Sequence, residues 1–182
     1  MTEKNYQALR VSQIIDETHD SRSFVFDIPQ EQTERFRYEA GQFLTFRVNY
    51  EGITLTRSYS LASSPTSTEP HKVTVKRVSG GRISNWFNDH VSVGDNLDVM
   101  PPSGRFTLRD SQNELVMFGG GSGITPVISI IKTALETTSR TIRLLYANRD
   151  ANSIIFADEL SALAEAHPDR LSITHSLDDR DG

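Results

Sequence analysis

The chain contains no cysteine among its 182 residues. A disulfide scaffold, a zinc ribbon, a thiol nucleophile and a cysteine-ligated iron–sulfur cluster are therefore excluded within it. It has no apolar segment near its beginning, so we expect no secretory signal peptide. Its most apolar stretch, residues 115–131, is interrupted by glycines and a proline, which argues against a membrane span. These absences favour a cytoplasmic protein.

Positive charge is also scarce, because 19 basic residues face 24 acidic ones and the net charge is −5. A chain of this charge is a poor binder of nucleic acid. The spacing of the five histidines matches no metal site, so we expect none; they are His19, His71, His90, His167 and His175. What is present is a globular composition, with 36% hydrophobic residues and enough length for one large domain or two small ones.

The first hundred residues are typical of β-structure. Short strand-forming runs alternate with turn signals, and they cover residues 9–11, 23–28, 43–48, 53–60 and 71–78. About six such strands indicate a closed barrel or a sandwich. One short helix is expected over residues 84–91, and the Pro101-Pro102 pair then ends this pattern.

The remaining residues alternate between strands and helices. Strands are expected at 114–118, 141–147 and 171–175, with helices over 124–137 and 153–167 between them. This β-α-β-α-β order predicts a parallel sheet, which in a doubly wound fold usually has five or six strands rather than three. We therefore expect two domains, an antiparallel β-barrel over 1–110 and an incomplete α/β nucleotide-binding domain over 111–182.

A glycine cluster follows the first of these parallel strands. Gly119, Gly120, Gly121 and Gly123 lie between a strand and a helix, where a backbone can approach a pyrophosphate and the helix N-terminus can bind it. Thr125 is expected to cap that helix, with Pro126 in its first turn. The spacing is not G-x-G-x-x-G, and a tight connection that binds no ligand is the alternative.

Two further motifs lie in the β-rich part. Arg57-Ser58-Tyr59-Ser60 offers a guanidinium for a phosphate, a ring for stacking and a hydroxyl for hydrogen bonding. The alternative is an exposed polar strand. Gly80 and Gly81 precede a second helix start, where Ser84 is expected as N-cap and an anion can bind. Here the alternative is an ordinary capped helix.

The order of these three motifs resembles the ferredoxin–NADP reductase family of flavoproteins over nearly all of residues 6–177. Residues 38–43 are similar to the family's Pro-Gly-Gln strand, with Ala40 in place of the usual proline. Residues 145–150, together with Ile155-Phe156 and Glu159-Leu160, are similar to reductase components of bacterial oxygenases, such as those of 3-ketosteroid 9α-hydroxylase and phenylacetyl-CoA oxygenase.

The resemblance implies a role for each matching residue in FAD binding. Tyr59 would lie against the flavin ring and Ser60 near its N5 atom, so these two are the expected catalytic residues. The FAD pyrophosphate would be held by Arg57 and by the helix start at Gly81, Arg82, Ile83 and Ser84. Lys76 would lie in the strand beside the flavin.

The same resemblance implies a site for a nicotinamide dinucleotide. Gly120, Gly121, Gly123 and Thr125 would receive its pyrophosphate, and Arg149 would lie near its adenosine. We expect NADH rather than NADPH, because Asp178 and Asp179 would repel a 2′-phosphate that only Arg149 opposes. NADH would then give a hydride to FAD, which would pass electrons singly to an iron–sulfur domain or to an oxygenase component.

Two parts of the family pattern are absent. A segment with a Cys-Gly-Pro turn near the nicotinamide would follow Gly182, and a ferredoxin-like domain with a 2Fe-2S cluster would need four cysteines. The sequence therefore indicates a truncated reductase. Two alternatives stay open: a free flavin reductase, or a non-catalytic flavin- or nucleotide-binding subunit for electron transfer or regulation.

Overall fold

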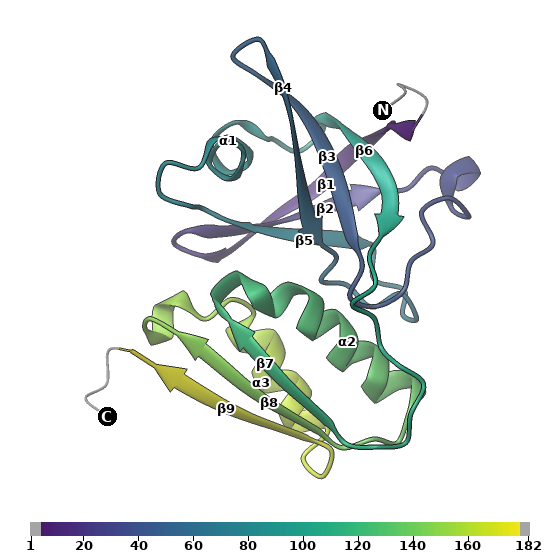
Figure 1. The fold of residues 1–182 in the computed structure, drawn as a ribbon, viewed down its shortest axis with the longest axis vertical. Coiled ribbons are helices and arrows are strands. Elements are labelled where there is room, and N and C mark those ends of the chain that lie inside the picture. The colour runs from purple at the N-terminus through teal and green to yellow at the C-terminus, as the bar shows by residue number, and fades with distance from the viewer. Residues whose placement is uncertain (1–4, 179–182) are drawn as a thin grey trace.

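The computed structural model describes residues 5–178 as two β-sheets with three α-helices (Figure 1). The first sheet comprises β1 (Gln7–Thr18), β2 (Ser21–Asp27), β3 (Phe43–Tyr50), β4 (Ile53–Ser60), β5 (His71–Lys76) and β6 (Asn96–Ser103), with the 3-10 turn η2 (Gln30–Gln32) and helix α1 (Arg82–His90) in its connections. The second part comprises β7 (Leu115–Gly120), η3 (Gly121–Gly123), α2 (Ile124–Thr137), β8 (Ile142–Asn148), η4 (Ala151–Ser153), α3 (Ala157–Ala166) and β9 (Leu171–Leu177).

The first sheet is an almost closed antiparallel barrel. Its strand order is β4-β3-β6-β1-β2-β5, and a bridge between Leu61 and Val73 joins the two outer strands. The alternation in β5 places Val73 and Val75 in the core, while Thr74 lies on the other face. The core is rich in aromatic rings, among them Phe24 and Phe87 in an edge-to-face pair with centroids 5.3 Å apart.

Strands β1 and β6 correct the expectations from sequence. β1 extends well beyond the expected residues 9–11. Its register shifts break the alternation of apolar and polar residues, so the sequence pattern did not reveal its full length. β6 was missed, and Pro101 and Pro102 lie within it rather than ending the pattern. They fall where the pairing of β3 with β6 skips between Phe43 and Thr45, so their missing N–H groups remove no regular ladder bond.

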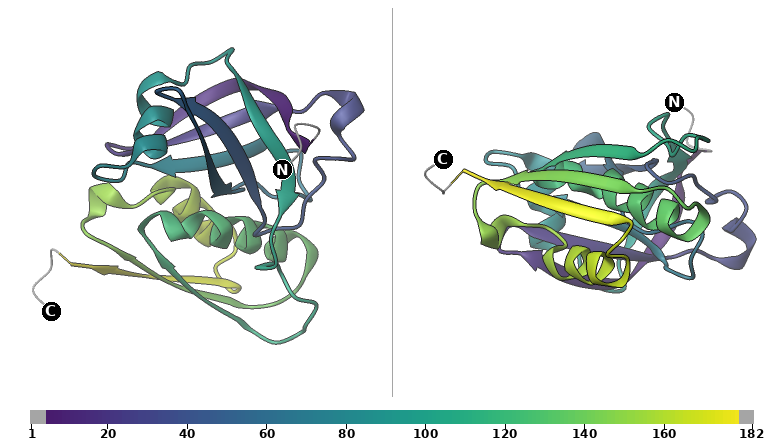
Figure 2. Two further views of the ribbon diagram at one scale, coloured as in Figure 1. Left: turned by 45° about the horizontal axis from the view of Figure 1, so that its top comes forward. Right: turned by 90° about the horizontal axis from the view of Figure 1, so that it is seen from below.

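The second sheet is parallel, with the order β7-β8-β9, as the alternation of strands and helices predicted. Both of its helices cover the same face and separate the sheet from the barrel (Figure 2). α3 begins at Ala157, later than the expected residue 153, because Phe156 adopts a left-handed conformation with φ 64°. No helix among residues 5–178 is long and apolar enough to cross a membrane.

A charged network around the buried Lys132 joins the barrel to the α/β part. Lys132 of α2 is 4% exposed and forms ion pairs with Glu69 at 2.7 Å and Glu159 at 2.8 Å. Glu159 of α3 also pairs with Lys72 of β5 at 3.2 Å. Burial would raise the pKa of Glu159, but these two lysines outweigh it and hold that pKa below its ordinary value. Because an unpaired buried charge is costly, the network fixes the barrel against α2 and α3.

Candidate functional site

A cavity of about 470 Å³ lies where the barrel meets the start of α2. Strands β4 and β5, the segment that leads into α1, and the glycine-rich turn before α2 all contribute to its wall. Ten of the expected site residues line it: Arg57, Tyr59, Ser60, Lys76, Gly81, Arg82, Ile83, Ser84, Gly123 and Thr125. Gly120, Gly121 and Arg149 do not line it. Three motifs that are separate in the sequence are therefore together in space, although the role of each residue stays a prediction.

The β4 side of the cavity offers a guanidinium and a ring. Arg57 is exposed, donates a 2.7 Å hydrogen bond to the carbonyl of Thr56, and pairs with no carboxylate of residues 5–178. The Tyr59 ring packs on Phe87 with centroids 5.3 Å apart. Burial raises the pKa of Tyr59 to about 12, although the charge of Arg57 lowers it, so the phenol is neutral at physiological pH.

The α1 side offers a helix start that no side chain caps. Gly81, not Ser84, is the N-cap, and the expectation of a Ser84 cap was wrong. The Ser84 hydroxyl instead accepts a 3.2 Å hydrogen bond from the backbone N–H of Val78. A Cβ on Gly81 would lie 2.5 Å from that hydroxyl oxygen, so a larger residue here would displace the Ser84 hydroxyl. The first N–H groups of α1 are left to meet another acceptor.

The α2 side repeats this arrangement. Gly123 is the N-cap without a side-chain bond, and the expected Thr125 cap was wrong because its hydroxyl donates to the carbonyl of Ser122 at 3.0 Å. Pro126 does lie in the first turn. No heavy atom comes within 4 Å of a Cβ added at Gly120 or Gly123, so a ligand can approach the backbone closely there.

A carboxylate that sequence reasoning missed lies beside the glycine-rich turn. Asp20, between β1 and β2, contacts Arg149 at 3.0 Å and Lys76 at 3.7 Å through its Oδ2 atom. Lys76 in turn lies next to Gly121, since a Cβ added there would be 3.9 Å from its ammonium nitrogen. No sequence signal reveals this cluster, because Asp20 and Arg149 are 129 positions apart.

Thr74 is a second missed residue of the cavity wall. It is 3% exposed, and its hydroxyl lies 2.6 Å from that of Ser23, which donates to Glu17 at 2.5 Å. Burial raises the pKa of Glu17 above its ordinary value. The alternating pattern of β5 places Thr74 opposite the core, where an exposed side chain is expected, and only the tertiary structure shows that it is buried.

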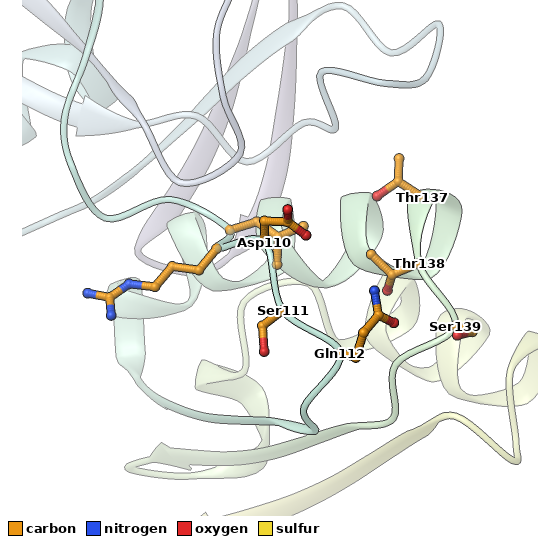
Figure 3. Close-up of a pocket in the computed structure, with 8 residues that line it drawn as sticks. Asp110, Ser111, Gln112, Thr137, Thr138 and Ser139 are labelled. Carbon is orange, nitrogen blue, oxygen red and sulfur yellow. The ribbon is translucent and has the colours of Figure 1, made fainter.

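A separate cavity of about 520 Å³ lies at the other end of α2 (Figure 3). Its wall is formed by Leu108, Arg109, Asp110, Ser111, Gln112, Thr137, Thr138 and Ser139. It includes none of the expected site residues and has no helix start, so it is a weaker candidate for a nucleotide.

Asp178 and Asp179 were expected to repel a 2′-phosphate. Asp178 is exposed, and its backbone N–H donates a 3.1 Å hydrogen bond to the carbonyl of Asn148, whereas Asp179 lies outside the described residues.

The cavity can bind an extended anionic ligand with an aromatic ring. Two uncapped helix N-termini and the exposed Arg57 and Arg82 suit two groups of phosphates. The neutral Tyr59 ring in the wall of the same cavity suits a flat heterocycle. FAD and a nicotinamide dinucleotide have this chemistry, so the residues present fit both.

Two families match the chain in the same order as these elements. The family described as "Oxidoreductase FAD-binding domain" matches residues 8–108, and "Oxidoreductase NAD-binding domain" matches residues 117–182. The expected division between residues 110 and 111 itself stays a prediction.

Several known proteins are similar to the chain. It is 49% identical to the ferredoxin reductase component of 3-ketosteroid-9-alpha-monooxygenase from Rhodococcus rhodochrous, over 96% of this chain and 50% of that protein. It is 34% identical to a component of 1,2-phenylacetyl-CoA epoxidase from Escherichia coli K12, over 92% of this chain and 48% of that protein. The chain thus spans about half the length of these curated relatives.

Among solved structures, the FAD/NAD-binding domain of a nitric oxide dioxygenase from Vibrio cholerae has a TM-score of 0.85. It is 24% identical, and the match covers 97% of this chain and 76% of that one. This likeness confirms the expected fold, a barrel followed by a parallel α/β sheet.

Proposed function

Because the chain belongs to the family of oxidoreductases that join an FAD-binding domain to an NAD-binding domain, we propose that it is the flavin-binding part of an oxygenase reductase. The observation that supports this most is the single cavity into which both uncapped helix starts open. One helix start belongs to each of the two matched domains, so each domain can hold one dinucleotide at a shared site.

On the barrel side, Arg57, Arg82 and the α1 start would hold the pyrophosphate of FAD. Tyr59 would lie along the flavin ring, and Ser60 would donate a hydrogen bond to its reacting edge. Lys76, in the strand beside the flavin, would line the same cavity between the flavin and the glycine-rich turn. These side chains position and stabilise, and none of them needs to act as an acid or a base.

On the α/β side, the backbone of Gly120, Gly121 and Gly123 would receive the pyrophosphate of NADH, with Thr125 in the first turn of α2. When bound, FAD supplies the redox chemistry, since it accepts a hydride from NADH and releases electrons one at a time. The chain contributes proximity, because its two phosphate sites lie on one cavity and bring the two rings together.

The electron acceptor in this proposal is an iron–sulfur domain or an oxygenase component. Support comes from the two relatives, one of which is named as the ferredoxin reductase component of a monooxygenase and the other as a component of an epoxidase. The acceptor's cluster must be supplied by another part or another protein, since this chain has no cysteine. We place the reaction in the cytoplasm, where reduced nicotinamide is produced.

Binding of FAD tests the first half of the proposal. A ligand that binds only the folded state adds roughly 2.7 kcal/mol at a hundredfold excess over its Kd. For a chain of this size, that corresponds to a rise in Tm of about 5–10 °C. An unchanged Tm in saturating FAD would contradict a flavin site.

Anaerobic addition of NADH to the FAD-loaded protein tests the second half. We expect the flavin absorbance to bleach and to return when an iron–sulfur acceptor is added. Flavin that stays oxidised would indicate a regulatory or electron-transfer subunit instead. Flavin that is reduced but lost on desalting would indicate a free flavin reductase.

A further inference from the structure

The turn between β1 and β2 presents a fixed carboxylate to the glycine-rich turn. The Oδ1 atom of Asp20 accepts hydrogen bonds from the hydroxyls of Thr18 at 2.9 Å and Ser21 at 3.1 Å. These bonds orient the side chain, which is 15% exposed. Its Oδ2 atom therefore points consistently at one group of neighbours.

Three basic side chains surround Oδ2. Arg149 lies at 3.0 Å, Lys76 at 3.7 Å and His19 at 3.8 Å. Burial by itself would raise the pKa of the Asp20 carboxyl, but the hydrogen bond from Thr18 and the charge of Lys76 outweigh it, and the pKa lies below its ordinary value. The carboxylate is thus charged at neutral pH and offsets part of this positive charge.

The location gives this pairing a consequence for nucleotide binding. Lys76 lines the cavity and lies beside Gly121, while Arg149 follows β8, whose Ala147 pairs with Gly120. A dinucleotide on the glycine-rich turn would therefore lie near both bases. Each additional negative charge on the ligand would meet a pair of bases that is already engaged by Asp20.

We propose that Asp20 is a specificity-determining residue: by holding Arg149 and Lys76 in ion pairs, it lowers the affinity of the site for a dinucleotide with an additional 2′-phosphate and so favours NADH over NADPH. This rests on the proposed function, in which the glycine-rich turn binds a nicotinamide dinucleotide. It gives the barrel a part in selecting a ligand that the α/β domain holds.

The test compares two probes that differ only in the 2′-phosphate, 5′-AMP and adenosine 2′,5′-bisphosphate. Their binding to the FAD-loaded protein is measured by calorimetry, so no turnover is needed. In Asp20→Asn we expect the bisphosphate to bind at least about fivefold tighter at low salt, with a smaller gain for 5′-AMP. The gain should disappear in 1 M salt, where the Debye length is about 3 Å.

Matched variants separate charge from structure. Asp20→Glu keeps the carboxylate and should retain the parent preference, whereas a gain there would show that a loosened turn is responsible and would overturn the proposal. Asp27→Asn removes the same charge at the other end of β2, from an exposed pair with Arg10, and should leave both affinities unchanged. Adding Arg149→Gln to Asp20→Asn should cancel most of the gain.

Failure of this proposal differs from failure of the proposed function. If 5′-AMP binds but Asp20→Asn shifts both probes equally or not at all, Asp20 does not select. If neither probe binds to any form of the FAD-loaded protein, the nicotinamide site is wrong and the selection by Asp20 is wrong with it.

Discussion

The two helices that open into the cavity begin alike but in different surroundings. α1 and α2 both have a glycine as N-cap. In both, the hydroxyl group of the first turn, from Ser84 or Thr125, hydrogen-bonds to the backbone of a preceding residue and does not cap the helix. Near α1, however, the exposed guanidinium groups of Arg57 and Arg82 add full charges. Near α2, the lining is mostly backbone and small side chains, and the nearest base, Lys76, is already paired.

In the proposed function, this difference would let one fold hold one dinucleotide firmly and exchange another. Charge-assisted bonds are about twice as strong as neutral ones, which suits a resident FAD at α1. Backbone N–H groups and a helix dipole give a weaker attraction, which suits a nicotinamide that must leave after each reaction. The predictions below remove one contributor at a time, starting with the contact that holds the two sites together.

Replacing Lys132 by methionine should have the largest effect. It would remove the cation that Glu69 and Glu159 share; because both carboxylates are partly exposed and Glu159 keeps its pair with Lys72, the cost lies at the lower end for breaking a buried pair, about 3 kcal/mol. We expect the Tm to fall by roughly 10 °C. Arg37→Met, which removes an exposed pair with Glu34, should change the Tm by less than about 2 °C. Equal effects of the two variants would show that the interface network does not hold the domains.

Gly120→Val tests the α2 site alone. The backbone there has φ −135° and ψ 120°, which valine adopts without strain, and a Cβ added there comes within 4 Å of no heavy atom outside the adjoining residues. It would fill the space above the glycine-rich turn, so NAD⁺ should bind at least about a hundredfold more weakly, or about 2.7 kcal/mol. Calorimetry should show FAD affinity and Tm unchanged. Retained NAD⁺ binding would show that the pyrophosphate does not bind at this turn.

Arg57→Ala tests the α1 site alone. A charge-assisted bond to a phosphate contributes roughly 1.5–3 kcal/mol, so FAD should bind about tenfold to a hundredfold more weakly. The matched control is Arg10→Ala, which removes an exposed ion pair with Asp27, neither of which lines the cavity. Flavin fluorescence titration distinguishes them, and unchanged FAD retention in Arg57→Ala would exclude this guanidinium from the site.

Glu17→Gln should have the smallest effect, and its direction depends on pH. Because the folded-state pKa of Glu17 is raised above its ordinary value of 4.5, the folded chain loses stability as pH rises from there through the folded-state pKa. The glutamine side chain does not ionise and so avoids this loss of stability. The Tm of the variant should therefore be about 2 °C above that of the parent protein at pH 8 and equal to it at pH 4. Exposed Glu31→Gln should show no such difference, and a pH-independent shift in Glu17→Gln would contradict the raised pKa.

Much of the fold could be predicted because the patterns are local. The strand 53–60 was predicted to the residue, and the β-α-β-α-β order gave the parallel sheet. The missed strand β6 contains two prolines, which local rules read as a break, yet its partner β3 tolerates them at a register shift. The predictions of the two helix caps were wrong because the hydroxyls of Ser84 and Thr125 form hydrogen bonds with other backbone groups nearby.

The sequence by itself determined the components proposed for the site: Arg57, Tyr59 and two glycine-led helix starts, each recognisable because its chemistry resides in neighbouring residues. Only the tertiary structure decided that these components share one cavity, that Lys132 fixes the two domains together, and that Asp20 engages Arg149. The physical reason is separation along the chain. No periodicity or motif predicts an ion pair between residues 129 positions apart, because the pair forms only when two folded parts of the chain meet.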